Sequence, residues 1–330
     1  MHEPWALTLV DTGRAAIVYH YAMSTPDTQP LLAIVGPTAV GKTALSIALA
    51  RALGGEIVSA DSRQVYRGMD IGTAKPTAAE RAAAPHHLVD IVDPDEDFSL
   101  ALYQELAYAA IGDIVARGRL PLLVGGTGQY LAAVLEGWQI PRVPPRPELR
   151  AELERAAEQA GAAALHARLA QVDPAAAAGI LPGNVRRVIR ALEVYHVTGR
   201  PISEQQAKHP PSYHIRTLWL TLPSASLYAR IDHRVDIMIE EGLVDEVRGL
   251  VARGYGWDLP AMSGLGYREF EAYLAGEATL EQAIERLKFD THAFARRQPA
   301  WFRRLPGGAQ LPADSPTLLA DALAWWRAGG

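Results

Sequence analysis

The residues best suited to chemistry lie in a short stretch, GPTAVGKT at residues 36–43, which directly follows an apolar run at residues 31–35. The spacing fits G-x-x-x-x-G-K-[ST], the pattern of a phosphate-binding loop between a strand and a helix. Glycines let the backbone approach a phosphate, and successive N–H groups then point at it. Lys42 would add a positive charge, and the Thr43 hydroxyl could bind a magnesium ion. The alternative is a glycine-rich turn that binds nothing.

A carboxylate suited to acid–base chemistry follows the next apolar segment. Asp61 lies in SADSRQVYRGMDIGTAKP, residues 59–76, directly after the apolar residues 56–60. At the end of a strand it could accept a proton from an attacking hydroxyl or amine. Its side chain could also cap a following turn. Position alone favours neither, and both interpretations remain open.

Basic residues gather in two places, although the formal net charge of the chain is −5. The first is NVRRVIRALEV, where Arg186, Arg187 and Arg190 precede the first acid, Glu193. On a helix, Arg186 and Arg190 would lie one turn apart. Such charges either lie on a solvated helix face or form a patch that faces RNA phosphates.

The second basic cluster spans residues 286–304, which hold six basic residues and a single acid, Asp290. Trp301 and Phe302 lie within this cluster. Guanidinium groups pair with phosphates and aromatic rings stack on unpaired bases, so the combination favours a nucleic-acid surface. The alternative is a helix with a buried aromatic face and a solvated basic face.

The elements that position these residues alternate between strands and helices. We expect strands at residues 31–35, 56–60 and 120–124, with helices at about residues 42–53 and after Ser99. The strand at 120–124 runs into GGTG. Such alternation predicts an α/β fold with a doubly wound, mainly parallel sheet. Ligands bind beyond the carboxyl ends of these strands, so the loops that follow the three strands should converge on one site.

A proline-rich segment, IPRVPPRPELR at residues 140–150, interrupts regular structure and predicts a crossing between domains. Alanine-rich helices follow it, and a strand returns at residues 217–222. A helical segment that lies between two strands of the same sheet indicates an inserted domain. We therefore expect the following organisation: a catalytic core at residues 31–140 and 211–330, an inserted helical domain at 141–210, and a flexible N-terminal extension at 1–30.

The composition excludes several kinds of site. The chain of 330 residues has no cysteine, which rules out disulfides, thiolate zinc sites and a cysteine nucleophile. Asp11 and Arg14 interrupt the apolar start, so we expect no signal peptide, and no apolar run is long enough to span a bilayer. We expect a globular, monomeric protein of the cytoplasm.

The motifs taken together resemble those of one family. GPTAVGKT, SADSRQVYRGMDIGTAKP, LLVGGTGQY, RALEV, GYR and RRQPAWFR span about residues 31–304 and are similar to the bacterial tRNA dimethylallyltransferases, also called tRNA isopentenyl transferases. The resemblance implies transfer of a dimethylallyl group from dimethylallyl diphosphate to N6 of adenosine 37, next to the anticodon. It also implies a P-loop-type core with an inserted helical domain that binds tRNA, and a Mg2+ ion.

The resemblance assigns candidate catalytic residues. It implies that Asp61 takes the proton from the adenine N6, that Thr127 serves in the loop after the third strand, and that Arg234 neutralises the leaving diphosphate. Arg230 is a second candidate for the last role. The diphosphate would be bound by the first loop, which consists of Gly36, Pro37, Thr38, Ala39, Val40, Gly41, Lys42 and Thr43. Thr43 is also the expected metal ligand.

The resemblance also implies contacts from several separate stretches to the anticodon stem-loop of tRNA. The expected contact residues are Asp61, Ser62, Arg63, Gln64, Thr127, Arg150, Arg186, Arg187, Arg190, Ser263, Gly266, Tyr267, Arg268, Arg296, Arg297, Gln298 and Arg303.

Other functions remain as alternatives. An ATP-dependent kinase for a nucleotide or small metabolite would use the same phosphate loop and a carboxylate at the same place. A tRNA-binding protein without activity would not need Lys42, Thr43 and Asp61, which are all present. A nucleotide-driven switch or motor is the least favoured, because it needs a strand that ends in an acidic residue, and the best strand here ends in GGTG.

Overall fold

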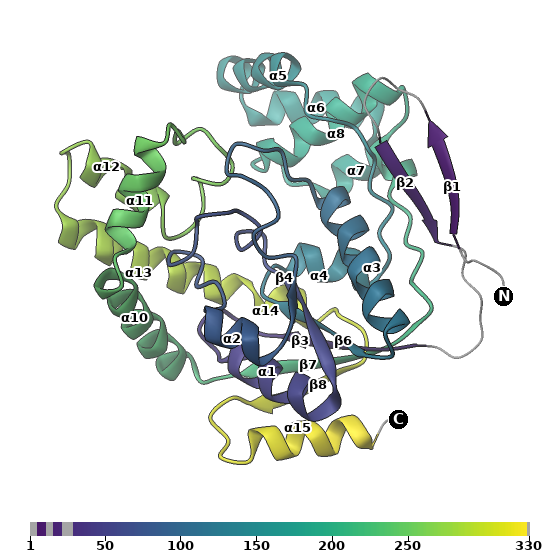
Figure 1. Cartoon of the computed structure of the whole chain (residues 1–330). Helices are drawn as coiled ribbons and strands as arrows, with labels where there is room; N and C mark the ends of the chain where they lie inside the picture. The colour runs from purple at the N-terminus through teal and green to yellow at the C-terminus, as the bar shows by residue number, and fades with distance from the viewer. Residues whose placement is uncertain (1–4, 11–15, 22–28, 329–330) are drawn as a thin grey trace.

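A computed structural model of the chain describes residues 5–10, 16–21 and 29–328, and its centre is a six-stranded sheet (Figure 1). The strands lie in the order β5-β4-β6-β3-β7-β8, and every neighbouring pair is parallel. Their bounds are Gln29–Val35 (β3), Gly55–Ala60 (β4), His86–His87 (β5), Leu120–Gly125 (β6), Tyr213–Thr221 (β7) and Gly308–Pro312 (β8). The expected α/β fold with a parallel sheet is confirmed.

Alternate side chains of the central strand β3 enter two different hydrophobic clusters. Leu31, Ala33 and Val35 pack with one pair of helices, and Leu32 and Ile34 pack with another pair on the opposite face. The first pair is α3 (Leu100–Ala116) and α4 (Gly128–Leu135), and the second is α1 (Lys42–Leu53) and α15 (Leu318–Arg327). Successive residues of a strand point to opposite faces, so a continuous apolar run is needed where both faces are covered.

Between α4 and β7 the chain leaves the sheet. It forms α5 (Pro147–Ala160), α6 (Ala162–Val172), α7 (Pro174–Gly179), α8 (Val185–Thr198) and α9 (Ile202–Gln205), which share a hydrophobic cluster of their own. At its base the Gln139 N–H donates to Ala207 O and the His209 N–H to Gly137 O, both at 2.8 Å. The helical segment therefore leaves and returns through one neck, and its treatment as an inserted domain stays a prediction.

A third hydrophobic cluster combines segments that are far apart in the sequence. It joins the loop after β4 to α10 (Ser224–Glu240), α11 (Leu243–Ala252) and α13 (Leu280–Arg297). Two short elements belong to it, the 3-10 helix η1 (Arg268–Phe270) and α12 (Glu271–Leu274). The other short helices lie elsewhere: α2 (Ala78–Ala83) contacts α1, and α14 (Pro299–Phe302) packs on α4. Val65, Met69 and Tyr267 are fully buried in this cluster. This cluster is not evident from the sequence, because its members are not neighbours along the chain.

Near the N-terminus, β1 (Trp5–Val10) and β2 (Ala16–Tyr21) pair antiparallel in a small separate sheet. No strand is predicted here from the sequence, although both segments are rich in the β-branched and aromatic residues that favour strands. β3 also begins earlier than expected, at Gln29. The predicted flexibility of the extension stays a prediction, and residues 1–4, 11–15 and 22–28 lie outside the described part. Among the described residues, no helix is both long and apolar enough to cross a membrane.

Candidate active site

The loop between β3 and α1 is a tightly wound phosphate-type loop. A Cβ at Gly36 would lie 2.9 Å from the backbone oxygen of Leu220, and Gly41 has a φ of 106°, which only glycine adopts readily. The Lys42 Nζ donates to the carbonyl oxygens of Gly36 and Pro37, both at 2.9 Å, and closes the loop. The N-terminus of α1 lies at this loop, as anion binding requires.

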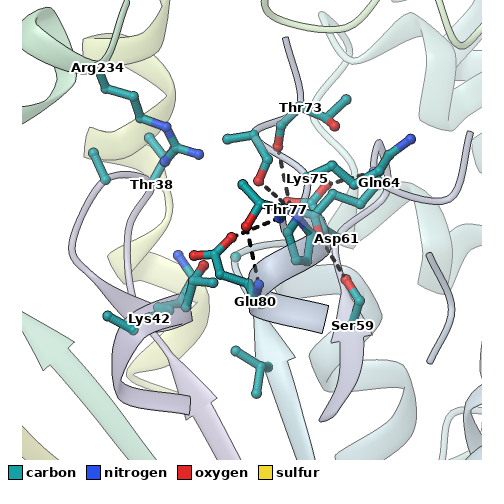
Figure 2. A pocket seen from close by; sticks show the side chains of 18 of the residues that line it. Thr38, Lys42, Ser59, Asp61, Gln64, Thr73, Lys75, Thr77, Glu80 and Arg234 are labelled. Atoms are coloured by element: carbon teal, nitrogen blue, oxygen red, sulfur yellow. Dashed lines mark hydrogen bonds between the residues drawn. The ribbon is translucent and has the colours of Figure 1, made fainter. Parts of the chain in front are cut away.

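The loop opens into a cavity of about 900 Å³. Its walls come from the residues that follow β3, β4 and β6, and from α10 and α13. The structure thus brings together the three loops that the sequence analysis expects to converge. Figure 2 shows Lys42, Asp61 and Arg234 among the side chains that line this cavity.

Cations gather on the side of the phosphate loop. Burial, followed by the positive charge of Arg234, lowers the pKa of Lys42 to about 8, against a smaller opposite effect of Asp61. Burial also lowers the pKa of Arg234, and the charges of Asp61 and Glu80 partly offset this effect. Arg230 lies one turn before Arg234 on α10 and donates to the carbonyl oxygen of Val40 at 3.3 Å. Both candidate arginines therefore lie at the cavity.

Asp61 follows β4, and its carboxylate both caps a turn and lines the cavity, so the two interpretations given above are compatible. Its Oδ1 accepts the N–H groups of Arg63 at 2.9 Å and Gln64 at 3.4 Å, so this oxygen caps a turn. Its Oδ2 has no hydrogen-bond partner among the described residues, and Asp61 lines the cavity. Thr127, in the loop after β6, accepts the Ser62 N–H on its Oγ1 at 3.1 Å. The two loops are therefore joined beside the carboxylate.

A hydrogen-bonded network holds the far wall of the cavity. The Gln64 side chain accepts from Ser59 Oγ at 3.1 Å and donates to Ala74 O at 3.1 Å. The buried Lys75 ammonium lies 2.5 Å from carboxylate oxygens of both Asp70 and Asp90. Burial acts to raise the pKa of Asp90, but hydrogen bonds from Lys75 and Arg81 outweigh it and lower this pKa. A buried charge is tolerated only when paired, and both ion pairs of Lys75 join segments that line the cavity.

One positioning residue of the same wall was missed by the sequence analysis. Glu246, on α11, accepts the N–H groups of Asp70 and Ile71 on Oε2, both at 2.8 Å, and that of Gly72 on Oε1 at 3.1 Å. The hydroxyl of Tyr267 donates to Oε1 at 2.7 Å. Nothing in the local sequence distinguishes this glutamate from an acidic residue in the first turn of any helix.

The stretch around Tyr267 packs on that wall. A Cβ at Gly72 would lie 2.6 Å from the Tyr267 ring, and Gly266 has a φ of 94°. Tyr267 and Gly266 are buried, whereas Ser263 and Arg268 are exposed. Arg268 pairs with Glu269 at 2.8 Å and with Asp290 at 3.3 Å. Arg63 reaches the same stretch and donates to the carbonyl oxygens of Pro260 and Ala261.

The helical segment at residues 141–210 holds four arginines that are expected to contact tRNA, and they divide into two groups. Arg186 and Arg187 are exposed on α8. Arg150 and Arg190 also bind the fully buried carboxylate of Glu193, at 2.7 and 2.6 Å, and their expected contact with tRNA stays a prediction. Burial acts to raise the pKa of Glu193, but hydrogen bonds from Arg150, the Arg146 N–H and Arg190 lower it to about 2. Glu193 follows Arg190 by three residues on the helix and so returns to the same face.

The C-terminal basic segment has two faces. Arg296, Arg297 and Arg303 are exposed, whereas Phe302 is 3% exposed and Gln298 is 4% exposed. The Trp301 ring lies against the next loop, since a Cβ at Gly128 would be 2.2 Å from its Cγ. Phe302 is part of the core cluster beside α4, and the half-buried Trp301 packs against it. This arrangement matches the alternative given above, a helix with a buried aromatic face and a solvated basic face.

A magnesium ion fits this site only together with a bound phosphate. Among the described residues, no group of three or more histidine and acidic side chains could hold a metal ion. Thr43, in the first turn of α1, lines the cavity and offers one hydroxyl oxygen. Mg2+ commonly takes few protein ligands and fills its shell with phosphate oxygens and water, so this donor set is sufficient.

The geometry can bind a diphosphate at the phosphate loop and accept a proton at Asp61 within one cavity. Lys42, Arg230 and Arg234 supply positive charge at the phosphate loop, and Asp61 supplies an unpaired carboxylate oxygen on the next strand end. Such a site suits displacement of a phosphate-type leaving group by a neutral nucleophile.

Comparison with known proteins gives consistent results. The IPP transferase family matches residues 64–305, and the isopentenyl transferase family matches residues 29–86. A tRNA dimethylallyltransferase of Roseiflexus castenholzii is 73% identical over 89% of this chain and 96% of its own length. That of Herpetosiphon aurantiacus is 61% identical over 89% of this chain and 93% of its own.

Solved structures agree with these matches. A tRNA isopentenylpyrophosphate transferase from Bacillus halodurans is 45% identical, with a TM-score of 0.68, and the match covers 91% of this chain and 96% of that one. A eukaryotic dimethylallyltransferase acting on tRNA is 31% identical, with a TM-score of 0.76, over 91% of this chain and 78% of its own.

Proposed function

The chain belongs to the IPP transferase family of tRNA dimethylallyltransferases, and from this premise we propose how its residues perform the reaction. It is a transferase of class 2.5.1 that moves a dimethylallyl group from dimethylallyl diphosphate to adenosine 37 of tRNA. The ATP-dependent kinase considered above is therefore wrong. The observation that supports the residue assignments is the meeting of the phosphate loop and Asp61 in one cavity.

We propose that residues 36–43 bind the diphosphate of the donor. The N–H groups at the start of α1, the Lys42 ammonium and Arg234 would face the oxygens on which negative charge develops as the bond from the allylic carbon to the bridging oxygen breaks. Arg230 lies against Val40 and would support the loop as well as the charge. These cations stabilise the leaving diphosphate, which departs with the electron pair of the broken bond.

We assign the proton transfer to Asp61. The adenine N6 is a weak nucleophile, and its attack on the first carbon of the prenyl chain becomes easier as its proton is removed. The Oδ2 atom of Asp61 accepts this proton, while Oδ1 keeps the turn in place. Thr127 positions the same turn through Ser62. An unpaired loop base leaves its stack at a cost of only a few kcal/mol, which allows adenosine 37 to enter the cavity.

We propose that Thr43 would hold a Mg2+ ion at the donor site. When bound, the ion neutralises part of the negative charge on the phosphate oxygens. The fit of Thr43 at the cavity supports this assignment.

The exposed basic residues on two separate elements support a tRNA surface. Arg186 and Arg187 lie on α8 of the helical segment 141–210, which we propose to be an inserted tRNA-binding domain. Arg296, Arg297 and Arg303 are exposed on either side of Gln298, which lines the donor cavity. We also propose that the enzyme acts as a monomer, in the cytoplasm where its tRNA substrate is found.

Labelling of a minimal RNA tests the function. Purified protein, Mg2+ and labelled dimethylallyl diphosphate are mixed with an anticodon stem-loop that carries adenosine at position 37. We expect label on that base, and none on a stem-loop with guanosine there, because guanine has a carbonyl oxygen in place of the N6 amine. Label on the guanosine RNA would contradict the assigned acceptor, and no label on either RNA would contradict the proposed activity.

A further inference from the structure

One residue of the C-terminal basic segment connects two loops of the donor site. The Oε1 atom of Gln298 accepts the N–H of Thr38 at 2.9 Å. Its Nε2 donates to the carbonyl oxygen of Gly126 at 2.9 Å. Thr38 belongs to the phosphate loop, and Gly126 lies directly before Thr127 in the loop after β6. A single side chain therefore joins the two loops that border the cavity.

The glycine at position 126 leaves room for this bridge. A Cβ there would lie 2.6 Å from Gln298 Nε2, and 3.6 Å from both Gly36 O and Lys42 Nζ. The bridging amide, the start of the phosphate loop and the Lys42 ammonium thus meet at one point. Any displacement of the bridge is transmitted to the groups that bind the diphosphate.

The position requires a side-chain amide. The Thr38 N–H needs an acceptor and Gly126 O needs a donor, and glutamine offers both from one planar group. A glutamate offers acceptors only, and a methionine of similar length offers neither. A buried backbone group without a partner costs about 1–3 kcal/mol. With 4% of its surface exposed, Gln298 has little area left for RNA.

We propose that Gln298 is a positioning residue of the donor site, which holds the phosphate loop at a fixed separation from the loop of Thr127, and that it does not contact tRNA. The inference rests on the proposed function, in which Lys42 and Asp61 must act on one donor and one acceptor. A shift of about 1 Å between such groups can cost about a hundredfold in rate. The proposal replaces the tRNA contact expected for this residue, whereas Arg296, Arg297 and Arg303 keep that expectation.

The test uses Gln298→Met, which keeps the length of the side chain and removes both hydrogen bonds. We expect calorimetric donor binding to weaken by about tenfold and kcat on the stem-loop to fall by about 10- to 100-fold. The Kd for the stem-loop and its dependence on salt should stay within about twofold of the wild type. Gln298→Glu keeps an acceptor for Thr38 and places another against Gly126 O, so its donor binding should also weaken.

Two controls separate the possible roles. Gln310→Met makes the same change at an exposed glutamine of β8 and should leave every parameter unchanged. Arg297→Ala should give the opposite pattern, with weaker RNA binding, a smaller salt slope and unchanged donor affinity.

Either of two results would overturn the proposal. If Gln298→Met behaves like Arg297→Ala, the residue is an RNA contact. If both Gln298 variants lower Tm but keep wild-type donor affinity and kcat, the bridge is only structural. Donor binding is measured without turnover, so wild-type protein that binds the donor but prenylates no RNA would contradict the proposed function and leave this test intact.

Discussion

At the scale of single residues, Asp61 uses its two carboxylate oxygens for different tasks. Oδ1 holds the turn that follows β4, and Oδ2 is available to a substrate. An asparagine can keep an oxygen at Oδ1 and lose the basic Oδ2. The substitution therefore separates the turn from the chemistry.

We predict that Asp61→Asn lowers the single-turnover rate by about two to four orders of magnitude, because the proton of N6 loses its acceptor. The Tm and the Kd for RNA should remain those of the wild type, since the turn keeps its hydrogen bonds. Rapid-quench measurement of labelled RNA gives the rate. A rate within a few fold of the wild type would reduce Asp61 to a structural residue.

The charge of Lys42 makes donor binding depend on pH. Its pKa is about 8 in the ligand-free protein, and a bound diphosphate raises this pKa because opposite charges attract. Above about pH 8, donor binding must then take up a proton, and affinity should fall by up to about tenfold per pH unit. Calorimetry in two buffers of different ionisation enthalpy measures both the affinity and the proton uptake.

Lys42→Ala provides the control for this pH dependence. It should bind the donor weakly at every pH and without proton uptake, while its affinity for RNA changes little. Proton uptake that persisted in the variant would assign the titration to another group.

At the scale of elements, α8 shows that arginines in one run can serve different purposes. Arg186 and Arg187 face solvent, whereas Arg190 neutralises a carboxylate in the hydrophobic interior of the helical segment. An isolated buried carboxylate would be costly, so Arg190 stabilises Glu193 within α8 and the ion pair with Arg150 holds α5 against α8.

We predict that Arg190→Ala lowers the free energy of unfolding by about 1–3 kcal/mol, because Glu193 loses one of its partners. The pKa of Glu193 is depressed to about 2 from an ordinary 4.5, so this carboxylate contributes stability above about pH 4.5 and loses it as pH falls toward 2. In the variant the folded-state pKa of Glu193 lies closer to 4.5, so the pH-dependent loss should be smaller and should end at a higher pH. Urea unfolding between pH 3 and 7 measures both effects.

Arg186→Ala should give the complementary result. Stability should stay within about 0.5 kcal/mol of the wild type, as for most exposed positions. The logarithmic salt slope of RNA binding should fall by about one unit for the lost phosphate contact. An unchanged slope would place Arg186 on a merely solvated helix face.

The contact of α11 with the loop after β4 gives a further prediction. In the wild type, three N–H groups and one hydroxyl donate to the two oxygens of Glu246, and Glu246→Gln leaves a single acceptor oxygen for them. We therefore expect the free energy of unfolding to fall by about 1–3 kcal/mol and kcat to decrease. Asp245→Asn, at an adjacent side chain that is 82% exposed, is the matched control and should change neither. Urea unfolding and steady-state prenylation compare the two; equal behaviour would contradict the role of Glu246.

At the scale of the whole molecule, the helical segment is attached through a neck closed by its own backbone hydrogen bonds. We predict that replacing residues 141–205 by a short glycine–serine linker leaves a folded core that binds dimethylallyl diphosphate within a few fold of the wild type. RNA affinity should fall by at least about tenfold, because Arg186 and Arg187 are removed. Calorimetry with each ligand tests this, and unchanged RNA affinity would contradict a tRNA-binding role for the segment.

The amino-acid sequence by itself was sufficient for features whose residues are adjacent in the chain. The phosphate loop, the strand before it and the helix after it follow from spacing within residues 31–53, since winding around a phosphate is a local property. The convergence of the three loops also follows, because parallel strands place their carboxyl ends at one edge.

Only the tertiary structure decided which side chains meet across the chain. Glu246 and the loop of Asp70 are 176 positions apart, and Gln298 and Thr38 are 260 positions apart. In the C-terminal basic segment, packing against α4 turned Trp301 inward and left the arginines outside. Periodicity identifies the faces of an element, but the partner of each face depends on how the elements pack, and that packing assigned Gln298 to the donor loops.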